Sequence, residues 1–155
     1  MKPIVLSFFF LFYFNLIFAT GKSEFYDVFK GDSSEKVDEL LQKYESIENP
    51  SLDISFYIGA LYIKKSNYGS TMRKKIDTFK RGRDIIEDII NKNINNIEYR
   101  FIRLIIQEQI PSVLKYDNNR DVDSKIIVEN LASIDDDLMF EIKDYSRISE
   151  TLNIN

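Results

Sequence analysis

The sequence has no cysteine, histidine or tryptophan, and only five glycines and three prolines in 155 residues. Without cysteine and histidine the chain has no Ser-His or Cys-His catalysis, no usual zinc ligands and no imidazole that titrates near neutral pH. Histidine is also the commonest general base of enzymes. We therefore expect a protein that is not an enzyme and that has no cofactor and no metal. A small enzyme that works with carboxylates is the alternative.

The first residues, 1–20, have the pattern of a signal peptide. One cation, Lys2, precedes an apolar run over residues 4–18 that two polar residues interrupt, and small residues follow. Cleavage is expected after Ala19 or Gly21. The run is shorter than the roughly 18 or more apolar residues of a membrane span, so we expect export to the periplasm or secretion. A membrane tether made by the uncleaved segment is the alternative.

The remaining residues, 21–155, are expected to form one domain, because about 135 residues bury roughly two thirds of their unfolded surface. With no disulfide, the apolar core has to stabilise an exported domain alone. Removal of Lys2 with the leader leaves 20 cations and 25 acids, a net charge of −5. This balance argues against nucleic acid as a partner.

Apolar residues in this part of the chain recur at spacings of three and four, which is typical of amphipathic helices. No stretch alternates as a half-buried strand would. The short aromatic stretch 24–29 precedes the first such pattern and is not assigned to a helix. Asp32, Asn49, Ser70 and Asp123 are expected N-caps, and the carboxylates of residues 135–137 are expected at the start of the last helix. We expect an all-α fold of about six helices, paired as antiparallel hairpins, near residues 33–47, 50–65, 71–91, 96–110, 123–132 and 136–148.

Two of these helices carry small and apolar residues in the register of a helical repeat, namely Ile58, Gly59 and Tyr62, followed by Gly82, Ile86 and Ile89. The pattern resembles a tetratricopeptide repeat. It departs from that repeat at Ser55, where a bulky aromatic residue is expected. The separation of the two glycines is also longer by about three helical turns, which keeps the faces in phase. The resemblance implies a right-handed stack of helix hairpins that binds a protein or peptide.

A second resemblance rests on residues 97–116, "IEYRFIRLIIQEQIPSVLKY", and on the acidic, asparagine-rich loop that follows them. This segment resembles one found in small exported bacterial proteins of unassigned activity. The resemblance implies export of the chain and leaves its activity open.

Four polar residues on apolar helices are candidates for a binding site. Arg83 lies within the apolar stripe of Phe79, where a charge is costly unless it is paired or reaches water. Its long stem can snorkel to solvent, or the charge can meet a carboxylate or face a ligand groove. Arg100, Arg103 and Gln107 form the one polar wedge of the next helix. This wedge is either the only solvated face of that helix or a polar strip that lines a concave surface.

A basic patch extends from Lys64 to Arg83, with eight cations against Asp77 and a local charge of +7, whereas residues 117–150 carry a local charge of −6. The patch can attract a membrane surface or another anion. The alternative is a solvated helix face, neutralised by the acidic tail of the same chain.

The acidic loop does not complete a calcium site. An EF-hand requires glycine at its sixth position and a bidentate acid at its twelfth, and Val122 and Val128 occupy these positions. Taken together, the sequence predicts an exported, all-α binding or scaffolding module that presents a concave helical face to a protein or peptide. Binding through the basic patch to a membrane surface or an anion is the alternative function.

Overall fold

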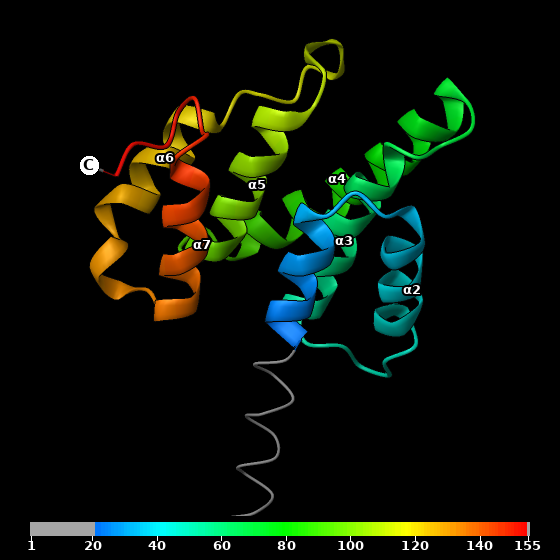
Figure 1. Cartoon of the computed structure of the whole chain (residues 1–155), viewed down its shortest axis with the longest axis horizontal. Coiled ribbons are helices and arrows are strands. Elements are labelled where there is room, and N and C mark those ends of the chain that lie inside the picture. Colours follow the sequence, from blue (N-terminus) through cyan, green and yellow to red (C-terminus); the bar gives the residue numbers. More distant parts are fainter. Residues whose placement is uncertain (1–20, 155) are drawn as a thin grey trace, which may run out of the picture.

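The computed structural model describes residues 21–154, in which α-helices are joined by short turns and no strand occurs (Figure 1). This confirms the all-α class and the expected number of about six helices. The helices are residues 21–30, α2 (Ser34–Glu45), α3 (Leu52–Ser66), α4 (Met72–Lys92), α5 (Ile97–Gln109), α6 (Arg120–Glu129) and α7 (Asp136–Ser146). Two 3-10 turns, η1 (Ser112–Leu114) and η2 (Leu131–Ser133), lie in the connections on either side of α6.

The α3–α4 hairpin is closely packed because two glycines meet where its helices cross. A Cβ atom built on Gly82 would overlap the carbonyl oxygen of Gly59, and one built on Gly59 would lie 2.7 Å from a methyl group of Ile86. Phe79 and Ile90 complete the buried stripe of α4. Both glycines of the repeat-like pattern thus lie against a neighbouring helix.

The aromatic stretch left unassigned by the sequence is part of a helix, residues 21–30. Phe25, Tyr26 and Phe29 are buried on one face, and the ring of Phe25 stacks on Tyr57 of α3 with 4.0 Å between centroids. Three aromatic residues within little more than one turn are too few to show a helical period. Packing on α3 stabilises this helix.

Several helices begin at other residues than expected, since Ser33 rather than Asp32 caps α2 and Thr71 rather than Ser70 caps α4. Ser51 caps α3 by accepting a hydrogen bond from the Ile54 amide at 3.2 Å, and Asn49 instead adopts a positive φ of 55° in the preceding turn. The prediction that Asp123 caps α6 is wrong as well, because α6 begins at Arg120 and Asp123 lies inside it. Asp135 does cap α7, since its carboxylate accepts from the Leu138 amide at 2.7 Å.

Six tyrosine hydroxyls donate hydrogen bonds to carboxylates on other elements of the fold. The pairs are Tyr26–Glu98, Tyr57–Glu98, Tyr62–Glu45, Tyr99–Asp53, Tyr116–Glu87 and Tyr145–Glu108. Burial raises the pKa of Tyr57 strongly, and the charge of Glu98 raises it further, so this hydroxyl remains a donor. Within residues 21–154, every buried side-chain nitrogen and oxygen has a partner. These pairs satisfy buried polar groups in a chain without histidine or tryptophan.

The predicted leader, residues 1–20, lies outside the described part of the chain. Within residues 21–154 we find no helix that is both long and apolar enough to cross a bilayer. Gly21 is the first described residue, and its carbonyl oxygen accepts a hydrogen bond from Tyr44 of α2 at 2.9 Å.

Candidate binding groove

The polar wedge of α5 lies in the protein interior. Arg103 is 4% exposed, and its Nε and Nη2 atoms donate to the two carboxylate oxygens of Asp123 at 2.7 and 2.8 Å. Arg100 donates to the same carboxylate at 2.7 Å and to the Ile94 carbonyl at 2.7 Å. Asp123 is fully buried and thus joins α6 to two arginines of α5. The interpretation of the wedge as a solvated face is therefore wrong.

The same network extends to α4 and to the loop before α6. Arg103 Nη1 donates to Glu87 at 2.9 Å, and the other Glu87 oxygen accepts from the Tyr116 hydroxyl. Gln107 exchanges two hydrogen bonds with Asn119, the residue that precedes α6. Burial alone would lower the pKa of Arg103, but the hydrogen bonds and charge of Asp123, with the charge of Glu87, raise it. Two arginines and two acids balance their charges here.

This network gives the predicted binding residues on α5 a structural role. Arg100 and Arg103 donate hydrogen bonds to Asp123 of α6, and Gln107 pairs with Asn119 in the loop before α6, all in the interior. Arg83 lies elsewhere, on α4, where it donates to the adjacent Asp84 at 3.0 and 2.7 Å with 35% of its side chain exposed. The structure thus brings three of the four residues together and separates Arg83 from them. Ligand binding by any of the four stays a prediction.

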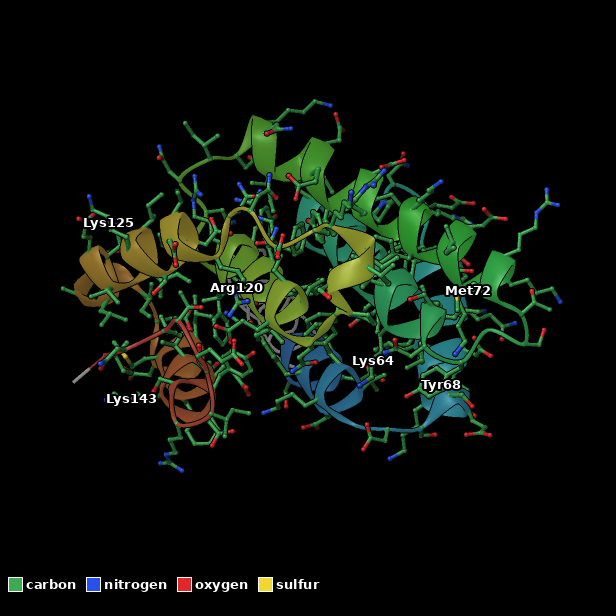
Figure 2. All side chains as sticks on the ribbon, turned by 90° about the horizontal axis from the view of Figure 1, so that it is seen from above. Lys64, Tyr68, Met72, Arg120, Lys125 and Lys143 are labelled. Atoms are coloured by element: carbon green, nitrogen blue, oxygen red, sulfur yellow. The ribbon has the colours of Figure 1, made fainter. Side chains whose placement is uncertain are left out.

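The basic patch is partly neutralised by acids of α2 and its flanks, and not by the acidic tail considered in the sequence analysis. Its ion pairs reach α2 and its flanks, as in Lys65–Asp38 at 2.6 Å and Arg81–Glu45 at 3.3 Å. The patch lies on α3 and α4. Tyr68, in the turn between these helices, is 38% exposed, and Met72, the first residue of α4, is 72% exposed. Figure 2 shows Met72 at the opposite end of the molecule from Lys143 of α7. Among the residues that the structure describes, no ion pair joins the patch to the acidic tail.

Glu108 of α5 also has structural partners. Glu108 accepts from Tyr145 at 2.8 Å and from the Ser149 hydroxyl and Thr151 amide at 2.9 Å each. Burial alone would raise the pKa of Glu108, but these hydrogen bonds outweigh it and lower the pKa. Glu108 thus fastens the segment after α7 to α5.

A groove separates the helix of residues 21–30 from α7, and ion pairs span it at two places. Lys22 lies 3.2 Å from Glu98 of α5 and 3.3 Å from Asp135, the N-cap of α7. Lys30 lies 2.7 Å from Glu141. Residue numbers increase together on both walls, so the two helices run in the same direction (Figure 1). Burial alone would lower the pKa of Lys22, but the two acids raise it, which keeps the ammonium charged.

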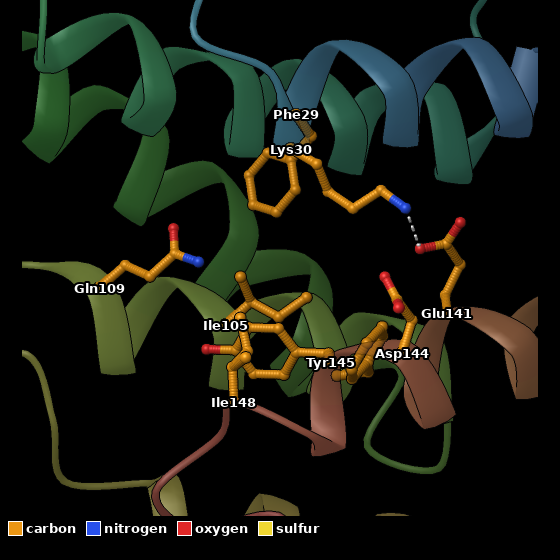
Figure 3. A pocket seen from close by; sticks show the side chains of 9 residues that line it. Phe29, Lys30, Ile105, Gln109, Glu141, Asp144, Tyr145 and Ile148 are labelled. Atoms are coloured by element: carbon orange, nitrogen blue, oxygen red, sulfur yellow. Dashed lines mark hydrogen bonds and ion pairs between the residues drawn. The ribbon is translucent and has the colours of Figure 1, made fainter.

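Two cavities lie along this groove, and Lys30 and Glu141 line both of them. The first has a volume of about 170 Å³ and an apolar lining from Phe29, Phe101, Ile105, Tyr145 and Ile148. Figure 3 shows Lys30 reaching over this cavity to Glu141, with Ile105, Tyr145 and Ile148 on the side opposite Phe29. The second has a volume of about 300 Å³ and a more polar lining that includes Lys22, Asp27, Asp137 and Phe140. We call these two cavities together the α7 groove.

Large apolar side chains stand unburied at the rim of the α7 groove. Phe140 is 65% exposed beside the polar cavity, and Ile148 is 75% exposed beside the apolar one. Leu138 and Ile142, by contrast, form the buried stripe of α7. Sequence reasoning missed this site. One signal was available in the sequence. Leu138 and Ile142 are four residues apart and form one apolar stripe of α7, whereas Phe140 lies two residues from each and therefore falls on a different face of the helix.

The groove contains no histidine or cysteine, and within residues 21–154 no cluster of acids is arranged to hold a metal ion. Its lining combines apolar, acidic and basic side chains. Comparison of the chain with family models, with curated proteins and with solved structures finds no match.

Proposed function

We propose that this protein is an exported binding module that receives a segment of a protein or peptide partner in the α7 groove. The observation that carries the proposal is the combination of a preformed apolar cavity, with the exposed Ile148 at its rim, and an adjoining polar cavity beside the exposed Phe140. Ligand sites are typically concave and mostly apolar, and exposed apolar side chains gathered at one place often mark a surface that a ligand or partner covers.

The size of the apolar cavity favours a side chain as the group that enters it. A cavity of about 150 Å³ with an apolar lining holds one benzene molecule, and the cavity here is about 170 Å³. One aromatic or branched aliphatic side chain fills such a space. The polar cavity beyond Lys30 and Glu141 then accommodates neighbouring residues of the same segment. A peptide anchored by one side chain is the ligand that uses both cavities.

The tetratricopeptide-like hairpin of α3 and α4 has a supporting part in this proposal. The Gly59–Gly82 crossing fixes α3 and α4 as a rigid unit, and α3 in turn carries Tyr57, on which Phe25 stacks. One wall of the groove is thereby held by the hairpin, while the floor comes from Phe101 and Ile105 of α5. A preorganised groove loses little conformational entropy when it binds a flexible partner.

Display of random twelve-residue peptides tests the proposal, with the full chain as the immobilised target. Binding of the enriched peptides is then compared for the wild type, a Phe140→Ser/Ile148→Ser variant and a Met72→Ser/Val113→Ser control. All four side chains are strongly exposed, at 65%, 75%, 72% and 80%, so neither variant disturbs the core.

We expect one enriched peptide family whose affinity falls at least about ten-fold in the groove variant, because a buried Phe or Ile contributes about 1.5–3 kcal/mol. The control variant should bind as the wild type does. Selection without an enriched family, or equal losses in both variants, contradicts the proposal.

A further inference from the structure

The charges around the α7 groove are unevenly compensated. Asp137, Glu141 and Asp144 lie on the groove side of α7, and Asp27 lies on the facing helix. Two cations face these four acids. Lys22 is already held between Glu98 and Asp135, neither of which belongs to this set of four.

Lys30 compensates only Glu141, at 2.7 Å. Asp27 and Asp137 are exposed and have no cationic partner among the described residues. Asp144 has a single contact, to Arg147 at 3.6 Å, and both side chains are about half or more exposed, where an ion pair contributes little. Three carboxylates at the groove therefore retain their capacity to pair with a cation.

We propose that the α7 groove selects a basic amphipathic segment of another protein, with one large apolar side chain in the apolar cavity and Lys or Arg side chains at Asp27 and Asp137. This inference rests on the proposed function and specifies the chemistry of its partner. Asp27 and Asp137 line the polar cavity, and the apolar cavity lies on the other side of the Lys30–Glu141 pair, so anchor and cations occupy separate places along the segment.

The α7 groove favours a basic segment over an acidic one because of the carboxylates along it. An acidic segment would place its carboxylates beside Asp27, Asp137 and Asp144, and like charges in close contact are repulsive. A basic segment gains attraction at the rim, and the exposed Phe140 and Ile148 cover the stems of its long cationic side chains. Such rim charges also accelerate association and make it sensitive to salt.

Three fluorescein-labelled peptides of twelve residues test the inference by anisotropy with the full chain. The first peptide carries Phe, Leu and five Lys in amphipathic order. In the second, each Lys is Glu, and in the third, Phe is Ser. The protein variants are Asp27→Asn/Asp137→Asn and, as a control of equal charge, Glu48→Gln/Asp121→Asn, which neutralises two exposed acids away from the groove.

The lysine peptide should bind at least ten-fold more tightly than either of the other two peptides. Its affinity should fall at least five-fold in the Asp27→Asn/Asp137→Asn variant and in 0.5 M salt, and less than two-fold in the control variant. Equal losses in both variants would reveal attraction to net charge alone and would overturn the inference.

Two further outcomes separate this inference from the proposed function. If display selection yields groove-dependent peptides that are acidic or neutral, the proposed function stands and the basic partner is overturned. If sedimentation shows that the chain self-associates and that the Phe140→Ser/Ile148→Ser variant abolishes this, a second copy occupies the groove and the inference is again overturned. Failure of every peptide, selected or synthetic, refutes the proposed function itself.

Discussion

Replacement of Asp123 by alanine tests whether the buried network of α4, α5 and α6 stabilises the fold. The carboxylate of Asp123 is fully buried and accepts three hydrogen bonds from Arg100 and Arg103 at 2.7–2.8 Å. Its removal leaves Arg100 with the Ile94 carbonyl alone and Arg103 with Glu87 alone. Two buried guanidinium groups would then lack their shared counter-charge.

The magnitude follows from how such contributions combine. Each hydrogen bond to a charged group contributes about 1.5–3 kcal/mol, but three bonds to one carboxylate are not additive. Loss of one partner of a buried ion pair costs about 3–5 kcal/mol, and we take this value for Asp123→Ala. The free energy of unfolding of a typical domain is about 5–15 kcal/mol, so this substitution removes a large part of the stability. The melting temperature should fall by about 10–20 °C.

Urea unfolding followed by circular dichroism measures this loss, with Asp121→Ala as the matched control. Asp121 lies on the same helix, is exposed and has no ion pair among the described residues, so its replacement should cost less than about 1 kcal/mol. Should the alanine variant not fold, Asp123→Asn keeps the volume and should fall between the control and the alanine variant. If Asp123→Ala and Asp121→Ala unfold at the same urea concentration, the reasoning is refuted.

Three further expectations concern the rest of the fold. Gly82→Ala should destabilise the α3–α4 hairpin by about 1–3 kcal/mol through overlap with Gly59, whereas Gly21→Ala, with no atom near its added methyl group, should be neutral or stabilising in thermal unfolding. Tyr57→Phe should cost about 1–3 kcal/mol in urea unfolding because Glu98 is largely buried and loses a donor, and an unchanged midpoint would contradict this. The pKa of Glu108 is lowered in the folded protein. The stability that its ionised carboxylate contributes is therefore present above the pKa of 4.5 that Glu108 has in the unfolded chain, and is lost as the pH falls below that value. The Glu108→Gln variant should therefore lose less stability between pH 5 and pH 3 than the wild type, and equal losses would contradict the assigned pKa direction.

The helices themselves were predictable from local patterns. In α4 the apolar residues Phe79, Ile86 and Ile90 recur at helical spacing, and they form its buried face. Gly59 and Gly82 were recognisable because a small residue in such a face permits close approach of a neighbour. The helix of residues 21–30 was missed, since its stability depends on stacking with Tyr57 rather than on a pattern of its own.

The candidate site could not be predicted from local sequence patterns, because it is formed by residues that are far apart in the chain. Arg100, Arg103 and Gln107 had the appearance of a ligand strip, because the sequence does not show that Asp123 of α6 packs onto the same face of α5. The α7 groove joins Lys30 and Glu141, which are 111 residues apart, and no spacing along the chain reveals such a neighbour. Exposure of Phe140 likewise depends on what α7 packs against.

The central claim is that the α7 groove is the place where a partner binds. Nuclear magnetic resonance of the nitrogen-15-labelled chain, titrated with the tightest peptide from display, tests it most directly. We expect amide shifts confined to residues 21–30, 101–109 and 136–148, with residues 67–72 at the far end unchanged. Shifts centred on residues 67–72, or on the outer faces of α2 and α4, would contradict the claim.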